Sequence, residues 1–168
     1  MSTDVATAEW IKRIASDERR RDTERVREDE IVARKADLIR RNGQRLIDEL
    51  RATVVRDVEA FRDEFVGDAA RAVVVDVTAP DGGFVVRKPA PLAVSLTVTP
   101  RLEAGAMVCH YQFTLADGLP PRAERIDVLF AGDGTETLQM RHQGTGQTFT
   151  ADALSEFLLV PVLTGRSR

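Results

Sequence analysis

The amino-acid sequence predicts a two-layer α+β fold: a long N-terminal helix or helical hairpin, an antiparallel β-meander of about five to six strands, and a short C-terminal helix. Before Gly67 the chain has no proline and a single glycine, whereas all seven prolines and nine of the eleven glycines follow it. Apolar residues recur with helical spacing before Gly67 and at every second position after Ala72. We therefore expect helices first and strands after them.

The strongest helical signal covers about residues 44–66. Its apolar residues are spaced by three or four, so they form one stripe along a helix while the charged residues between them face water. Gly67 follows at a position where a left-handed residue ends a helix. We expect this stripe to cover one face of the sheet. The stripe consists of Ile47, Leu50, Val54, Val58, Phe61 and Phe65.

The segment before this helix, residues 17–30, is almost wholly charged, with acidic and basic residues interspersed. Pairs such as Asp17 and Arg21 place the acid four residues before the base, which stabilises an exposed helix by about 0.2–0.5 kcal/mol per pair. We therefore expect a helix here that is surrounded by solvent.

The two helical segments meet at Asn42-Gly43, where two geometries are open. The apolar rhythm continues through this pair, which favours one helix over about residues 7–66. Glycine in a helix interior costs about 1 kcal/mol relative to alanine, so a helical hairpin at Asn42-Gly43 is the alternative. In both cases we interpret residues 1–43 as a charged helical extension and residues 44–168 as a helix-covered antiparallel sheet domain.

Strict alternation of apolar and polar residues predicts strands with one buried face. Turn-forming residues at 80–83 and 132–135 separate some of these segments. An antiparallel meander is the simplest topology. The predicted strands lie at residues 72–78, 84–88, 92–99, 107–115, 126–131 and 136–142.

The C-terminal helix is predicted to begin after Thr150, whose hydroxyl suits an N-cap. Pro161 cannot donate a backbone hydrogen bond, so we expect the helix to kink or finish there. Val162 and Leu163 would then pack as an extended end.

Composition bounds the possible functions. The net charge of -3 produces no long-range field that would attract a polyanion such as DNA. Cys109 is the only cysteine, which excludes an intramolecular disulfide and a cysteine-rich zinc cluster and suits a reducing compartment. No apolar run has the length of a signal peptide or a membrane span, so we expect a cytoplasmic protein. Three lysines among 24 basic residues indicate a GC-rich bacterial genome, which bears on codons and not on chemistry.

No catalytic constellation is visible. Cys109 and His110 are adjacent on a predicted strand and therefore point to opposite faces, which argues against a nucleophile and base pair. Gly144 and Gly146 form a GxG without the third glycine and following helix of a dinucleotide-binding loop. We expect no enzymatic activity, no metal site and no cofactor.

The run Arg19–Arg21 is the one feature that resembles a nucleic-acid contact. Acidic neighbours dilute it, and no aromatic residue is interleaved to stack on a base. The same run lacks an apolar face that could insert into a membrane surface. We therefore expect neither a nucleic-acid partner nor a membrane.

The favoured function is a non-enzymatic protein-protein interaction or assembly module, in which the N-terminal helix oligomerises or docks on a partner. A charged helix with scattered apolar residues is hard to cover within one small domain, whereas a coiled coil or bundle covers it directly. A homo-oligomer and a hetero-complex are both open. The expected partner-binding residues are Trp10, Ile11, Ile14, Ile31, Val32 and Ile39.

The alternative is a small-molecule-binding or enzymatic α+β domain with a pocket between sheet and helix, an interpretation based on fold analogy. Its polar groups would be His110, Asp127, Arg141 and His142.

Overall fold

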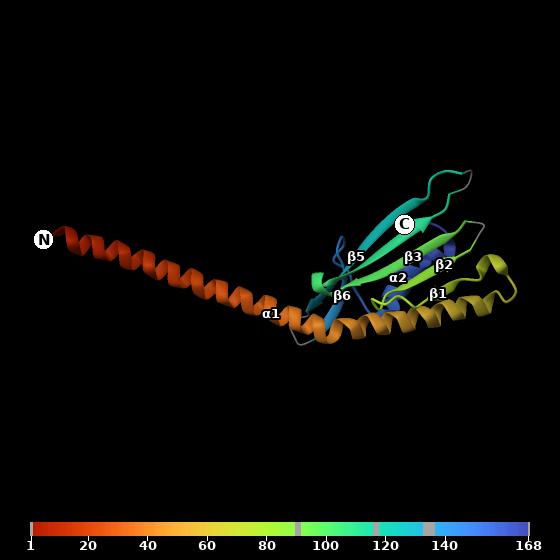
Figure 1. Ribbon diagram of the computed structural model, residues 1–168, viewed down its shortest axis with the longest axis horizontal. Helices are drawn as coiled ribbons and strands as arrows, with labels where there is room; N and C mark the ends of the chain where they lie inside the picture. The colour runs from red at the N-terminus through yellow and green to blue at the C-terminus, as the bar shows by residue number, and fades with distance from the viewer. Residues whose placement is uncertain (1, 90–91, 116–117, 133–136, 168) are drawn as a thin grey trace. The chain divides into compact units, whose positions relative to one another are not determined.

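The computed structural model describes residues 2–89, 92–115, 118–132 and 137–167, with side chains from residue 8 onward. The chain divides into two compact units, residues 1–37 and residues 38–168. The first unit is helical throughout its described part, and the second contains the sheet (Figure 1).

Helix α1 (Ser2–Glu64) is one continuous helix, so the long helix and not the hairpin is present at Asn42-Gly43. Gly43 is buried by close packing within the second unit, to which it belongs. A Cβ atom at this position would lie 2.8 Å from Cδ2 of Leu102, so any larger residue would force the Leu102 side chain to shift. The glycine at this position therefore allows close packing against Leu102 and does not break the helix.

In the residues that the structure describes, seven strands form one antiparallel sheet in which every strand is hydrogen-bonded to its neighbours in sequence, so the predicted meander is confirmed. The sheet has one strand more than the five to six expected. The additional strand, β7, has only two residues, too few for alternation to reveal it. The strands are β1 (Val74–Asp76), β2 (Phe84–Lys88), β3 (Val94–Arg101), β4 (Ala106–Phe113), β5 (Arg122–Gly132), β6 (Leu138–His142) and β7 (Thr148–Phe149).

Two short 3-10 helices, η1 (Ala69–Arg71) and η2 (Leu102–Ala104), connect α1 to β1 and β3 to β4. Neither of them is among the elements predicted from the sequence. The turn expected at residues 132–135 and the start of the following strand at Glu136 fall partly outside the described residues.

The core lies between one face of the sheet and two helices, α1 and α2 (Ala151–Thr164). Val86, Leu96 and Tyr111 are paired in register across β2, β3 and β4 and are almost completely buried on this inner face. The hydroxyl of Tyr111 donates a hydrogen bond to the carbonyl of Leu158 in α2 at 2.6 Å. Figure 1 shows α2 and the second part of α1 against the sheet.

Thr150 caps α2 as predicted, because its hydroxyl accepts a hydrogen bond from the amide of Ala153 at 3.1 Å. The expectation that the helix finishes at Pro161, with Val162 and Leu163 as an extended end, is wrong, since α2 continues to Thr164. Pro161 and Val162 are buried in the core, and the amide of Gly165 donates to the carbonyl of Pro161 at 3.0 Å. Packing and this left-handed cap hold one more helical turn than propensity alone would allow.

Candidate functional site

The N-terminal part of α1 exposes the apolar residues that the sequence singled out. From Ala8 to Ala36 every side chain is exposed except Ala15, which is half-buried. Trp10 is 48% exposed and Ile14 is 52% exposed, so each keeps about half of its surface in contact with solvent. Ile11, Ile31 and Val32 are exposed as well.

Ile39 departs from this set. Its side chain is only 5% exposed and belongs to the core of the second unit, together with Leu38. A Cβ atom on Gly105 would lie 3.1 Å from Cδ1 of Ile39, which shows how closely the loop after β3 covers it. Ile39 is therefore a core residue and not an exposed partner-binding residue. Helical spacing could not separate the two roles, because the same stripe continues across the boundary between the units.

Ion pairs along this part of α1 lie within single turns of the helix. Arg21 is 3.0 Å from Glu18, and Arg25 is 3.9 Å from Asp22. These side chains are all more than half exposed, so each pair contributes little to stability. The pairs do engage two of the arginines that could otherwise have formed a basic patch.

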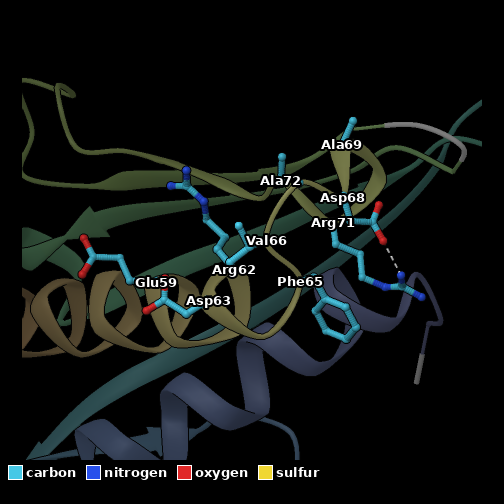
Figure 2. A pocket seen from close by; sticks show the side chains of 10 residues that line it. Glu59, Arg62, Asp63, Phe65, Val66, Asp68, Ala69, Arg71 and Ala72 are labelled. Atoms are coloured by element: carbon cyan, nitrogen blue, oxygen red, sulfur yellow. Dashed lines mark hydrogen bonds and ion pairs between the residues drawn. The ribbon is translucent and has the colours of Figure 1, made fainter.

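The connection between α1 and β1 surrounds a hollow of about 600 Å³ (Figure 2). Within it the guanidinium of Arg71 lies 4.4 Å from the ring centre of Phe65 and forms an ion pair with Asp68. The hydrogen bond from Arg71 lowers the pKa of Asp68, and the amide of Ala70 adds a second hydrogen bond. These three side chains therefore hold the chain reversal after Gly67, where φ is 82°. The other charged side chains around the hollow are Glu59, Arg62 and Asp63.

A second hollow, of about 470 Å³, lies where β1 to β4 present the face opposite the core. Arg87, Ser95 and Gln112 contribute polar side chains from adjacent strands, in register with one another. Val74 and Pro121 contribute apolar surface. These residues cannot be recognised as a group from the sequence, because the register between four strands is not visible in the spacing along one strand.

The adjacent Cys109 and His110 point to opposite faces of β4, as strand alternation predicts. Cys109 is completely buried, and His110 is exposed on the outer face between Thr97 and Arg125. Burial, with a smaller effect of the charge on Asp127, raises the pKa of Cys109 to about 12. A protonated thiol in the core is neither a nucleophile nor a metal ligand.

The four polar residues expected to form a ligand site do not all line one hollow. Asp127 and His142 line a common hollow of about 320 Å³, but His110 and Arg141 do not line it. Asp127 is already bonded to Arg125 at 2.8 Å. Nδ1 of His142 accepts hydrogen bonds from the amides of Gly144 and Thr145 at 2.9 and 3.0 Å, so His142 organises its own turn.

The interior between sheet and helices is tightly packed around its central residues. These side chains are shielded from solvent almost completely, as in a close-packed protein core. In the described residues, side chains therefore fill the centre of the space between the sheet and the two helices. They include Ile47, Leu50, Val54, Phe84, Val86, Leu96, Met107, Phe130, Leu154 and Leu158.

Over the described residues, no three histidine, cysteine, aspartate or glutamate side chains come close enough to hold a metal ion. Neither helix, in the part that the structure describes, has an apolar stretch long enough to cross a bilayer. No family model matches this chain, and no curated protein and no solved structure matches it either.

Proposed function

We propose that the protein is a non-enzymatic interaction or assembly module whose N-terminal helical segment docks on another chain. The observation that carries this proposal is the exposure of Trp10, Ile11 and Ile14 at one end of the segment and of Ile31 and Val32 at the other. Isolated apolar residues are common on protein surfaces, but three large ones within five residues of a helix form a patch. Covering that patch is the driving force for association.

The stability of the segment supports the same proposal. Residues 8–36 have no packed apolar face of their own, and a helix without such packing depends on weak pairs between exposed side chains. A partner chain would supply the missing packing. The second unit would then act as the folded body that the docked segment brings to the assembly.

The test uses the full-length chain as bait and compares three proteins. The first is the wild type, the second carries Ile11→Arg and Ile14→Arg, and the third carries Val26→Arg as a matched control. Val26 is 55% exposed, but it lies about 18 Å further along the helix than Ile14 and roughly 120° around it, outside both apolar patches. Analytical ultracentrifugation measures self-association, and affinity capture followed by reconstitution with the purified partner measures a hetero-complex.

We expect the wild type and Val26→Arg to form the same complex and the double variant to lose it. The fluorescence of Trp10, the only tryptophan, should shift to shorter wavelength on binding. A wild type that stays an 18.6 kDa monomer and whose captured proteins are unchanged by the double variant would contradict the proposal.

Small-molecule binding is the second candidate, and the hollow beside Arg87, Ser95 and Gln112 is the observation that favours it. This site would lie on the outer face of the sheet, not between sheet and helix. Chemical-shift mapping with a library of small polar molecules tests it. A ligand of this site should shift the amides of these three residues and lose affinity in Arg87→Ala but not in Arg125→Ala.

A further inference from the structure

The exposed segment of α1 has a regular arrangement of charge around its apolar residues. We number the segment in heptads, abcdefg, with Ile11 at position a. The large apolar residues at both ends of the segment then occupy positions a, d and g. Trp10 and Ile31 are separated by 21 residues, as are Ile11 and Val32, so the end patches repeat after three heptads. At about 1.5 Å per residue the two patches lie roughly 30 Å apart along the helix.

The acidic and the basic residues of this segment occupy different heptad positions. Every charged residue at e and g is acidic, and every charged residue at b and c is basic. Positions a and d between the apolar ends carry Glu18, Arg21, Arg25 and Glu28. The acidic set is Asp17, Asp22, Glu24 and Asp29, and the basic set is Lys12, Arg13, Arg19, Arg20, Arg27 and Arg34.

The face that contains the apolar patches is therefore the acidic one. Its two arginines are already engaged, Arg21 with Glu18 and Arg25 with Asp22. In the part of the chain that the structure describes, no ion pair involves Asp17, Glu24 or Asp29. These carboxylates border the path along which a second helix would have to lie between the patches.

Self-association through this face is opposed by charge. In a parallel pair of helices, position g of one chain faces position e of the other, so Asp17 would meet Asp22 and Glu24 would meet Asp29. In an antiparallel pair, g faces g and e faces e, which again brings acid to acid. Both orientations place like charges together, and such contacts disfavour a partner.

We propose, building on the proposed function, that the occupant of this face is a basic helix of a different chain, with lysine or arginine at its e and g positions and apolar residues at both ends. Such a helix would pair its cations with the four acids and cover Trp10, Ile11, Ile14, Ile31 and Val32 with its apolar residues. A straight helix drifts by about 20° per heptad relative to this pattern, and the supercoil of a paired helix would remove that drift.

The test titrates the full-length protein with synthetic peptides spanning residues 8–36. Each peptide carries Trp10→Leu, so that only Trp10 of the protein fluoresces. One peptide keeps the remaining native sequence. A control peptide places lysine on the opposite side of the helix, through Glu9→Lys, Ser16→Lys, Thr23→Lys and Glu30→Lys. The complementary peptide reverses the charges of the acidic face, through Asp17→Lys, Glu18→Lys, Arg21→Glu, Asp22→Lys, Glu24→Lys, Arg25→Glu, Glu28→Lys and Asp29→Lys.

We expect the complementary peptide to bind at least about tenfold more tightly than the other two, with a blue shift of Trp10 emission and weaker binding at high salt. Equal or tighter binding of the native peptide would overturn the proposal in favour of a second copy. Equal binding of the control and complementary peptides, or no binding of any peptide, would also overturn it.

The two proposals fail separately. If capture depends on Ile11 and Ile14 but the peptides do not discriminate, the docking surface stands and its basic partner does not. If capture does not depend on Ile11 and Ile14, the docking surface itself is wrong, whatever the peptides do.

Discussion

Helix α1 belongs to both units of the chain, and its two parts differ in what they bury. Residues 38–64 bury Ile47, Leu50 and Val54 completely, whereas residues 8–36 leave all their large apolar side chains exposed. Full burial of one such side chain stabilises the fold by about 1.5–3 kcal/mol. An exposed pair of opposite charges contributes about 0.2–0.5 kcal/mol. The same backbone conformation is thus maintained by tertiary packing in one part and by local interactions in the other.

The largest difference should appear in thiol reactivity. In Ser16→Cys the chain has one thiol in each unit, because Ser16 is exposed and Cys109 is buried. Reaction with a disulfide reagent at neutral pH should be biphasic, with the Cys109 phase at least ~1,000-fold slower because it requires unfolding. If both thiols reacted in one fast phase, Cys109 would be as accessible to the reagent as the thiol at position 16. That result would contradict the burial of Cys109 in the sheet unit.

The raised pKa of Cys109 also fixes the sign of a pH effect. Its pKa rises from the usual 9.0 to about 12 on folding, so the native state favours the protonated thiol. The stabilisation that results is fully present below pH 9.0 and is lost as the pH rises toward about 12. Cys109→Ala should therefore lose less stability than the wild type over this alkaline range, as measured by thermal unfolding.

The next largest effect should come from truncating one apolar side chain in each part of α1. Leu50→Ala removes a completely buried side chain and should lower the free energy of unfolding by about 2–5 kcal/mol. Ile14→Ala, at a half-exposed position, should change it by less than about 0.5 kcal/mol. Urea unfolding followed by circular dichroism measures both. Similar losses for the two variants would contradict the comparison.

A smaller effect is expected from two hydroxyls that donate to helix carbonyls. Tyr111 is buried and donates to Leu158, whereas Thr23 is exposed and donates to Arg19 at 2.9 Å. Tyr111→Phe should cost about 0.5–1.5 kcal/mol, because a buried hydrogen bond is lost. Thr23→Val should leave the free energy of unfolding nearly unchanged, because water can replace the exposed hydrogen bond of Thr23. Urea unfolding followed by circular dichroism measures both changes. If Tyr111→Phe left the free energy of unfolding unchanged, the hydroxyl of Tyr111 would contribute nothing to stability.

The smallest effect is expected at exposed ion pairs between residues three apart. Asp68 has a pKa below its usual 3.8 because of its hydrogen bond to Arg71, so any stabilisation is present above pH 3.8 and is lost as the pH falls further. Arg71→Gln should bring the pKa of Asp68 back toward 3.8, as measured by NMR titration. At acid pH the thermal unfolding midpoints of the wild type and Arg71→Gln should become equal. Arg21→Gln, which removes the pair with Glu18, should leave the midpoint unchanged at every pH.

The sequence alone was sufficient to predict the structure wherever a local pattern agrees with the tertiary environment of its residues. Helical spacing predicted the stripe that includes Leu50 and Val54, and alternation placed Cys109 and His110 on opposite faces of one strand. Thr150 identified the start of α2 because N-capping depends only on neighbours in the chain. The apolar residues of the candidate surface and the heptad arrangement of its charges are also properties of sequence.

Only the tertiary structure decided what lies against each residue. It placed the side chain of Leu102 directly against Gly43, and it buried Ile39 while leaving Ile14, on the same stripe, exposed. It carried α2 past Pro161 because packing of that turn outweighs a missing hydrogen bond. Periodicity records which side of an element is apolar, whereas burial depends on whether another part of the chain reaches that side.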